Sequence, residues 1–224
     1  MSFGDKKLSE IAVSVPGSTS LLREYDLDFC CGGSDTLAHA AAEKGLNLAE
    51  IETRLTELQN SKAENPEEYW VNATYPEIID HILVRYHQRH REQFQELIVL
   101  ADRVESVHGD REDCPIGVAA ELRNVYEDLS NHMMKEEHVL FPMIKAGNYM
   151  MAQMPIRMME MEHAEHGEHL DVLKSLTNNM TPPADACNTW RALYSGIQEF
   201  ADDLMMHIHR ENNILFPRVI AENH

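Results

Sequence analysis

Apolar side chains recur at steps of three and four residues through four long stretches that begin near residue 75. This spacing places them on one face of an α-helix and is typical of the buried seam of a helix bundle. Glycine, asparagine and proline separate the stretches, and short connections make consecutive helices antiparallel. The pattern predicts an all-α fold with a C-terminal up-down four-helix bundle. Its predicted seam positions are Ile79, Leu83, His87, His90, Phe94, Leu97, Ala101 and Val104; Leu122, Val125, Leu129, His132, Glu136, Val139 and Met143; Ile156, Met159, His163, His166, Leu170 and Leu173; and Trp190, Leu193, Ile197, Phe200, Leu204, His207, Glu211 and Ile214.

The first part of the chain has shorter helical patterns. Asn47 and Glu50 have the spacing of a capping box before an apolar run, and the glycines after Cys30-Cys31 predict a turn. The stretch from Ser61 to Pro66 is polar and contains proline, as a linker does. We therefore expect a small helical Cys-Cys domain at 1–60, a linker at 61–73 and the bundle at 74–224.

The predicted seam contains a repeated polar motif. His132-x3-Glu136 is followed by Leu-Phe-Pro, and the same letters recur from His207-x3-Glu211, at an offset of 207 − 132 = 75 residues. A repeat of this kind indicates a duplicated structural unit, so the bundle is predicted to be internally duplicated. Within each copy, the histidine and glutamate lie one turn apart on the same helical face.

A second pair of histidines has nearly the same shift. His87-x2-His90 reappears as His163-x2-His166, at an offset of 163 − 87 = 76 residues. Each copy therefore offers one separate histidine and one His-x3-Glu pair. The predicted metal ligands are His87, His132, Glu136, His163, His207 and Glu211.

These residues occupy positions where leucine or isoleucine would be expected. Burying carboxylates and imidazoles costs several kcal/mol unless they are paired or coordinate a metal. Four imidazoles and two carboxylates can hold two ions, with Glu136 and Glu211 placed to bridge them. A hard oxygen and nitrogen donor set favours iron or manganese over copper(I), and zinc is a further alternative.

The remaining histidines, methionines and cysteines that could bind a metal are not placed among the predicted ligands. His90 and His166 lie a turn away and are left out of the ligand set, as groups that support the ligands, line a channel or pack in the core. His138 and His209 fall off the stripe and are expected to be solvated. The methionines clustered between 150 and 161 are expected to pack adaptably in the core, with copper binding as the alternative. Cys114 and Cys187 are expected to be structural.

Composition limits the remaining possibilities. Lys+Arg 19 against Asp+Glu 38 gives a net charge of −19, which argues against nucleic acid and anionic membrane surfaces as partners. No apolar stretch reaches the roughly 20 residues needed to span a bilayer. Four cysteines and no apolar export signal at the N-terminus predict a reducing cytoplasm.

The six predicted ligands and both Leu-Phe-Pro tails resemble the hemerythrin-like di-iron domain. The segment from Tyr25 to Gly33, with Cys30 and Cys31, is similar to the small domain fused to it in the iron-sulfur cluster repair proteins. This resemblance covers essentially the full chain. It implies that the six positions bind two non-haem iron ions.

The resemblance also implies a function. Members of that family restore iron-sulfur clusters damaged by nitrosative and oxidative stress, by supplying iron, and a nitric-oxide-related redox reaction has been proposed for them. Damaged iron-sulfur proteins or cluster-assembly proteins are then the expected partners, and Cys30 and Cys31 are expected redox or iron-transfer thiols. The alternative is a hemerythrin-like sensor or storage protein for oxygen, nitric oxide or iron, without turnover.

Overall fold

The computed structural model describes residues 2–61 and 64–222, and these residues are mostly helical. Within them there is no β-strand, only an isolated bridge between Lys7 and Thr36, so the predicted all-α class is confirmed. Residues 1, 62–63 and 223–224, which fall in the three predicted ranges, lie outside the described residues. Two compact units are present: 79–205, and 1–78 together with 206–224.

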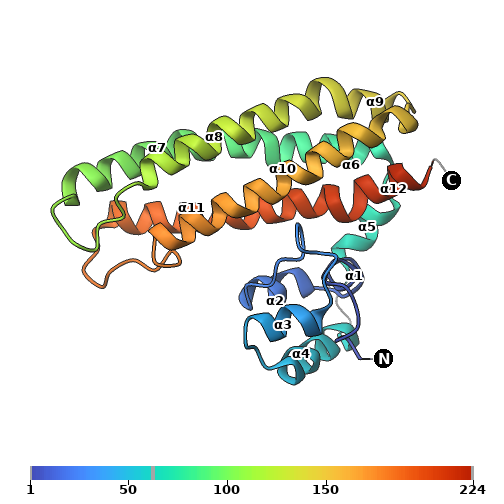
Figure 1. Cartoon of the computed structure of the whole chain (residues 1–224), viewed down its shortest axis with the longest axis horizontal. Helices are drawn as coiled ribbons and strands as arrows, with labels where there is room; N and C mark the ends of the chain where they lie inside the picture. Colours follow the sequence, from blue (N-terminus) through green and yellow to red (C-terminus); the bar gives the residue numbers. More distant parts are fainter. Residues whose placement is uncertain (1, 62–63, 223–224) are drawn as a thin grey trace. The chain divides into compact units, whose positions relative to one another are not determined.

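Four long helices form the unit of 79–205, and they lie side by side as the predicted up-down bundle (Figure 1). Leu97 lies so close to Gly196 that a Cβ added at Gly196 would lie 2.7 Å from Leu97 Cδ2, so a larger residue there would force the leucine side chain to shift. Two of the elements of this unit, α6 and α11, extend beyond its boundaries and are given with their full ranges. The elements are α6 (Tyr75–His81), η1 (Ile82–His87), α7 (Gln88–His108), α8 (Val118–Lys135), η2 (Glu136–Leu140), α9 (Phe141–Lys145), α10 (Tyr149–Leu176) and α11 (Asn188–Arg210).

Short π-helical segments shift the buried face of two helices from the predicted positions. Val139 is 44% exposed and its neighbour Leu140 is buried, because η2 adds a residue to the turn and rotates the rest of the helix. Ile144 is buried in place of Met143 for the same reason. In η1, Ile82 and Tyr86 are buried, whereas Leu83 is only half-buried. The prediction of buried seam positions is therefore wrong at 83, 139 and 143, and the other predicted seam positions are buried.

The second unit is also helical. Its core is built from the apolar residues Leu8, Ile11, Leu22, Leu27, Phe29, Leu37, Ile51 and Leu55. Helix α5 occupies part of the stretch predicted as a linker. The elements are α1 (Leu8–Ser14), α2 (Ser18–Glu24), α3 (Leu37–Glu43), α4 (Leu48–Asn60), α5 (Pro66–Asn72), η3 (Glu211–Leu215) and α12 (Phe216–Ala221).

His209 is fully buried, so the prediction that it is solvated is wrong. Its ring packs edge-on against Phe29 at 5.4 Å between centroids, and its Nε2 atom lies 3.4 Å from Glu67 Oε2. The helical pattern around His209 could not show this, because residues from α5 and from the Cys-Cys segment cover that face. Burial lowers the pKa of His209, which therefore stays neutral near pH 7.

Glu67 pairs with the buried guanidinium of Arg210, whose Nη2 donates to Glu67 Oε1 at 3.2 Å. Replacing Glu67 by glutamine is expected to lower the free energy of unfolding by about 3 kcal/mol or more, because Arg210 then keeps a buried charge without a carboxylate. Denaturant unfolding measures this. The matched control is Glu68→Gln in the same helix, whose side chain is exposed and which should change stability little; equal losses in both variants would contradict the role of the pair.

The same pair predicts an acid dependence. Burial raises the pKa of Glu67, but the hydrogen bonds from His209 and Arg210 outweigh it, and the pKa is lowered overall. A carboxyl group whose pKa is lower in the folded state stabilises the folded protein at pH values above its unfolded pKa of about 4.3. This contribution is lost as the pH falls through the folded pKa. Unfolding measured from pH 5 downward should therefore show a smaller acid loss in Glu67→Gln than in the parent.

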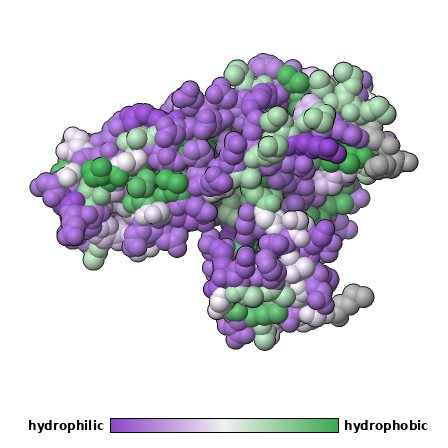
Figure 2. Space-filling model, in the orientation of Figure 1, coloured by the Kyte–Doolittle hydropathy of each residue, from purple (hydrophilic) through white to green (hydrophobic). Residues whose placement is uncertain are grey.

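Five methionines of α10 lie at the surface, between 50% and 76% exposed, and not in the core as expected. The inward face of α10 is taken by Ile156, Met159 and His163, so the remaining positions point outward. Figure 2 shows hydrophobic residues interrupting a surface that is otherwise mostly hydrophilic. The exposed residues are Met150, Met151, Met154, Met158 and Met161.

Among the described residues, no helix combines the length and the apolar character needed to cross a bilayer.

Candidate metal centre

Each π-helical segment begins or ends at a predicted metal ligand. His87 ends η1, Glu136 begins η2 and Glu211 begins η3. The segments η2 and η3 are themselves one repeat apart, since 211 − 136 = 75. π-Helical turns are rare and concentrate at functional sites. The duplication therefore carries a local backbone distortion along with the side chains.

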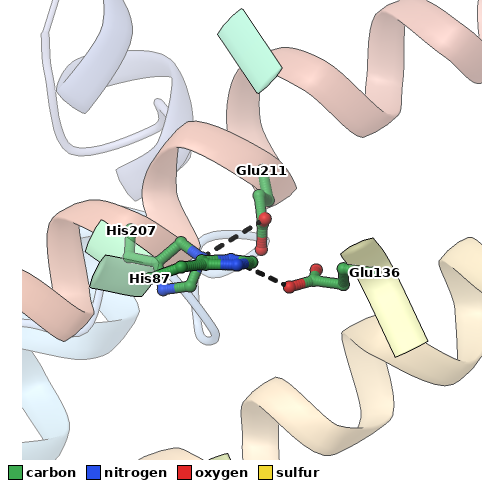
Figure 3. A group of neighbouring side chains, drawn as sticks. All are labelled: His87, Glu136, His207 and Glu211. Carbon is green, nitrogen blue, oxygen red and sulfur yellow. Dashed lines mark ion pairs between the residues drawn. The ribbon is translucent and has the colours of Figure 1, made fainter. Parts of the chain in front are cut away.

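The structure brings all six predicted ligands into two buried groups. The ligand atoms of His87, Glu136, His207 and Glu211 lie within 4.8 Å of one another, and Figure 3 shows these four side chains pointing toward one another. In the second group, His132 and His163 join the same two carboxylates, again within 4.8 Å. Both glutamates belong to both groups, so each carboxylate can face two ions.

The histidines present one particular ring nitrogen to the carboxylates. His87 Nε2 lies 3.3 Å from Glu136 Oε2, and His132 Nε2 lies 3.5 Å from Glu136 Oε1. His207 Nε2 lies 3.4 Å from Glu211 Oε1. His163 Nε2 faces His132 Nε2 at 3.0 Å. All four Nε2 atoms are thus directed into the cluster.

A carboxylate orients His87 from the other side. Glu137 Oε1 lies 2.8 Å from His87 Nδ1 and accepts a hydrogen bond of 2.7 Å from Arg91. The hydrogen bond with His87, together with that from Arg91, holds the pKa of Glu137 at about 2 against the opposing effect of burial. An ionised partner at Nδ1 keeps the proton there and leaves Nε2 as the donor atom for a metal.

His132 has an equivalent arrangement. Glu162 Oε2 lies 2.9 Å from its Nδ1, and Lys135 hydrogen-bonds the other oxygen of the same carboxylate. The hydrogen bond with His132 and that from Lys135 lower the pKa of Glu162 to about 2. The sequence pattern did not predict that Glu137 and Glu162 would contact the candidate ligands His87 and His132. Their only signal is that each stands beside a predicted ligand, and the repeat does not mark Glu137, because the matching position at 137 + 75 = 212 is Asn212.

The donor set fits two cations of intermediate or hard character. Four imidazoles and two carboxyl groups are all buried in the protein interior, where an ion that coordinates them offsets the cost of their desolvation. Sharing both carboxylates between two four-residue groups is the arrangement of a bridged pair of metals. Carboxylate and imidazole together suit iron, manganese or zinc.

The remaining histidines lie outside these two groups. His90 is buried, with Nδ1 3.1 Å from Gln93 Oε1. His166 is buried with its ring edge-on to His132 at 4.9 Å. These contacts make both residues part of the packing around the cluster. His138 is exposed as predicted.

The Cys-Cys segment is a tight loop organised by Asp28. Its Oδ1 atom accepts from the backbone amides of Cys30 at 3.0 Å and Cys31 at 2.9 Å, and Oδ2 accepts from Gly32 at 2.8 Å. Cys30 is buried and Cys31 half-buried. The hydrogen bond with Cys31, and burial, raise the pKa of Cys30 well above its ordinary value, so its sulfur is protonated in the absence of a metal.

The other two cysteines differ from each other. Cys114 is buried, as a structural residue should be. Cys187 is exposed, with its Sγ 3.3 Å from His108 Nε2. None of the four cysteines, all of which are described, forms a disulfide.

Residues 78–219 match the family described as the hemerythrin HHE cation binding domain, and residues 4–59 match a domain of unknown function, DUF542. The chain is 68% identical over 222 residues to a probable iron-sulfur cluster repair protein of Haemophilus influenzae, covering 99% of this chain and all of that protein. It is 54% identical to the iron-sulfur cluster repair proteins YtfE of Musicola paradisiaca, covering 98% of each chain, and of Escherichia coli, covering 99% of each.

The chain belongs to the iron-sulfur cluster repair proteins. This membership and the helices of the structure confirm the predicted family and fold. The predicted repair function is confirmed as well, and so is the di-iron cofactor, which the buried His/Glu groups fit. Damaged iron-sulfur proteins are the targets of this repair protein.

Proposed function

We propose that His87, His132, Glu136, His163, His207 and Glu211 hold the two iron ions, and that this centre serves repair by donating iron to damaged clusters. The observation that carries the proposal is the pair of buried four-residue groups that share both glutamates. When bound, the iron supplies a labile metal pool and a redox-active centre. The protein's own residues hold and orient it: Glu137 and Glu162 fix the ring nitrogens of His87 and His132.

The roles within this proposal rest on ligand chemistry. The bundle ligands are nitrogen and oxygen atoms, whereas an iron-sulfur cluster is held by sulfur. Cys30 and Cys31 supply the soft ligand type that the bundle lacks, which supports a role as iron-transfer or redox thiols. Cluster-assembly proteins are proposed as further partners, and nitric oxide and oxygen as small molecules that reach the iron.

A division of the chain into 1–60, 61–73 and 74–224 accompanies this proposal. The two family matches, which end at 59 and begin at 78, support it. A cytoplasmic location is proposed as well, supported by four cysteines without a disulfide, which is typical of a reducing compartment.

Elemental analysis tests the metal assignment. Protein prepared without oxygen from iron-replete cells is expected to contain about two iron ions per chain, the stoichiometry of a paired carboxylate-bridged site. The optical spectrum should change on oxidation as a coupled di-iron centre requires. One metal per chain, or stoichiometric zinc in place of iron, would remove the di-iron assignment.

A further inference from the structure

The sulfur atoms of the Cys-Cys loop are spaced for one metal ion. Cys30 Sγ and Cys31 Sγ lie 3.8 Å apart. Two thiolates on one tetrahedral ion, each at about 2.3 Å as in zinc sites, lie about 3.8 Å from one another. The two sulfurs therefore need little or no movement to ligate a single ion.

Asp28 adds an oxygen to the same site. Its Oδ1 atom accepts a hydrogen bond from the Cys30 thiol at 3.1 Å, and the ligand atoms of Asp28, Cys30 and Cys31 all lie within 4.8 Å. An oxygen and a sulfur on one tetrahedral ion lie roughly 3.6 Å apart, so replacing the thiol proton by a metal requires a shift of only about half an ångström. Asp28 is exposed and Cys31 half-exposed, so solvent reaches one side of this group.

The loop is held in this shape before any metal binds. Besides the bonds to Asp28, Asn213 Nδ2 donates to the carbonyl of Phe29 at 2.8 Å and Asn212 Nδ2 donates to that of Cys30 at 3.0 Å. Gly33 approaches the Phe29 carbonyl so closely that an added Cβ would lie 2.6 Å from it. A site held in its bound geometry loses less conformational entropy on binding.

The two asparagines come directly after Glu211 and occupy the repeat positions of Glu137 and His138, since 137 + 75 = 212 and 138 + 75 = 213. In the first copy, the residue after the glutamate orients a histidine of the cluster. In the second copy, the corresponding residue holds the Cys-Cys loop. The duplicated unit thus uses one position for two purposes, and η3 joins the loop to a residue of the di-iron centre.

We propose that Asp28, Cys30 and Cys31 form a second metal site with three ligands, which binds a thiophilic divalent cation. During repair this cation is Fe²⁺, and a thiolate of the protein under repair supplies its fourth ligand. This rests on the proposed iron-donating function. The transfer is a ligand exchange: iron stays Fe²⁺, each loop thiol releases one proton to water when it ligates and takes one up again when it is displaced, and further thiolates of the protein under repair replace the loop ligands as the ion leaves. No oxidant or reductant is consumed.

Cobalt(II) is the probe, because its bond to a thiolate gives a charge-transfer absorption that His/Glu coordination does not. The holoprotein, with iron retained in the bundle, is titrated with Co²⁺ under reducing conditions. We expect one Co²⁺ per chain with a two-thiolate band. Asp28→Asn should weaken binding about 10-fold or more, in line with the loss of a charged group from a metal site, and Asn212→Ala up to about 10-fold through the loss of one loop hydrogen bond.

Matched cysteine variants locate the site. Cys31→Ser, which alters a half-exposed side chain, should leave a weaker band, and Cys30→Ser with Cys31→Ser should abolish it. Cys187→Ser, which removes an exposed thiol elsewhere, should leave it intact. A band that survives the double variant but vanishes in Cys187→Ser would overturn the proposal. Asp28→Asn with unchanged affinity, and unchanged bundle iron as evidence of folding, would overturn the three-ligand assignment.

Repair activity separates this inference from the function on which it rests. The parent protein could bind two irons and repair clusters fully and yet show no cobalt-thiolate band. This result would contradict the metal site in the loop but not the donation of iron. A normal band with no repair of a damaged cluster would leave the metal site standing and remove iron donation.

Discussion

Alanine in place of Glu136 or Glu211 is expected to reduce bundle iron from about two ions to below about one per chain. Each carboxylate belongs to both four-residue groups, so its loss affects both ions. Removing a residue that only supports a ligand typically lowers metal affinity by about 10–100-fold, and removing a shared ligand should cost more. Elemental analysis and the optical spectrum of oxygen-free preparations measure the effect.

The control for this experiment must be a residue near the site that does not face it. His138→Ala serves, because His138 is exposed and stands two residues from Glu136, and Glu127→Ala serves as an exposed carboxylate on α8. His209→Ala is unsuitable, because that ring is buried against Phe29 and Glu67. Equal iron loss in the His138, Glu127 and Glu136 variants would mean that Glu136 is not a ligand.

Serine in place of both Cys30 and Cys31 is expected to leave the bundle iron and its spectrum unchanged but to lower repair of a damaged iron-sulfur enzyme on the order of 10-fold or more. The thiolate, and not the hydroxyl, is the ligand for a soft acceptor site. The bundle ligands are histidine and glutamate, so they should hold iron without these sulfurs. Iron content is measured beside recovery of enzyme activity in vitro.

A double variant of Cys114 and Cys187 to serine is the matched control for removing two thiols. Full repair in the Cys30/Cys31 variant would exclude the thiol role and leave the first 60 residues without a chemical part in transfer. Loss of iron from the bundle in that variant would instead contradict the separation between holding and transferring iron.

Much of the bundle was accessible from periodicity because its signal is local. Steps of three and four residues place side chains on one face whatever surrounds the helix, and the third and fourth predicted seams are buried at every position. The repeat indicated which polar residues act as a set.

Tertiary packing decided the features that depend on contacts distant in sequence. An ideal period of 3.6 residues cannot show where a π-helical turn rotates a helix, so Leu140 replaced Val139 at the buried face. His209 is buried because α5 and the Cys-Cys segment cover it, and no pattern within its own helix contains that information.

The sequence by itself determined the fold class, the family and the six residues that gather in the bundle, because helical periodicity and a duplicated motif are both written in local spacing. Only the tertiary structure decided that Glu137 and Glu162 orient the histidines, that the methionines of α10 face outward, and that Asn212 and Asn213 hold the Cys-Cys loop. Each of these features depends on how helices and loops distant in sequence pack against one another, and not on the spacing within any one segment.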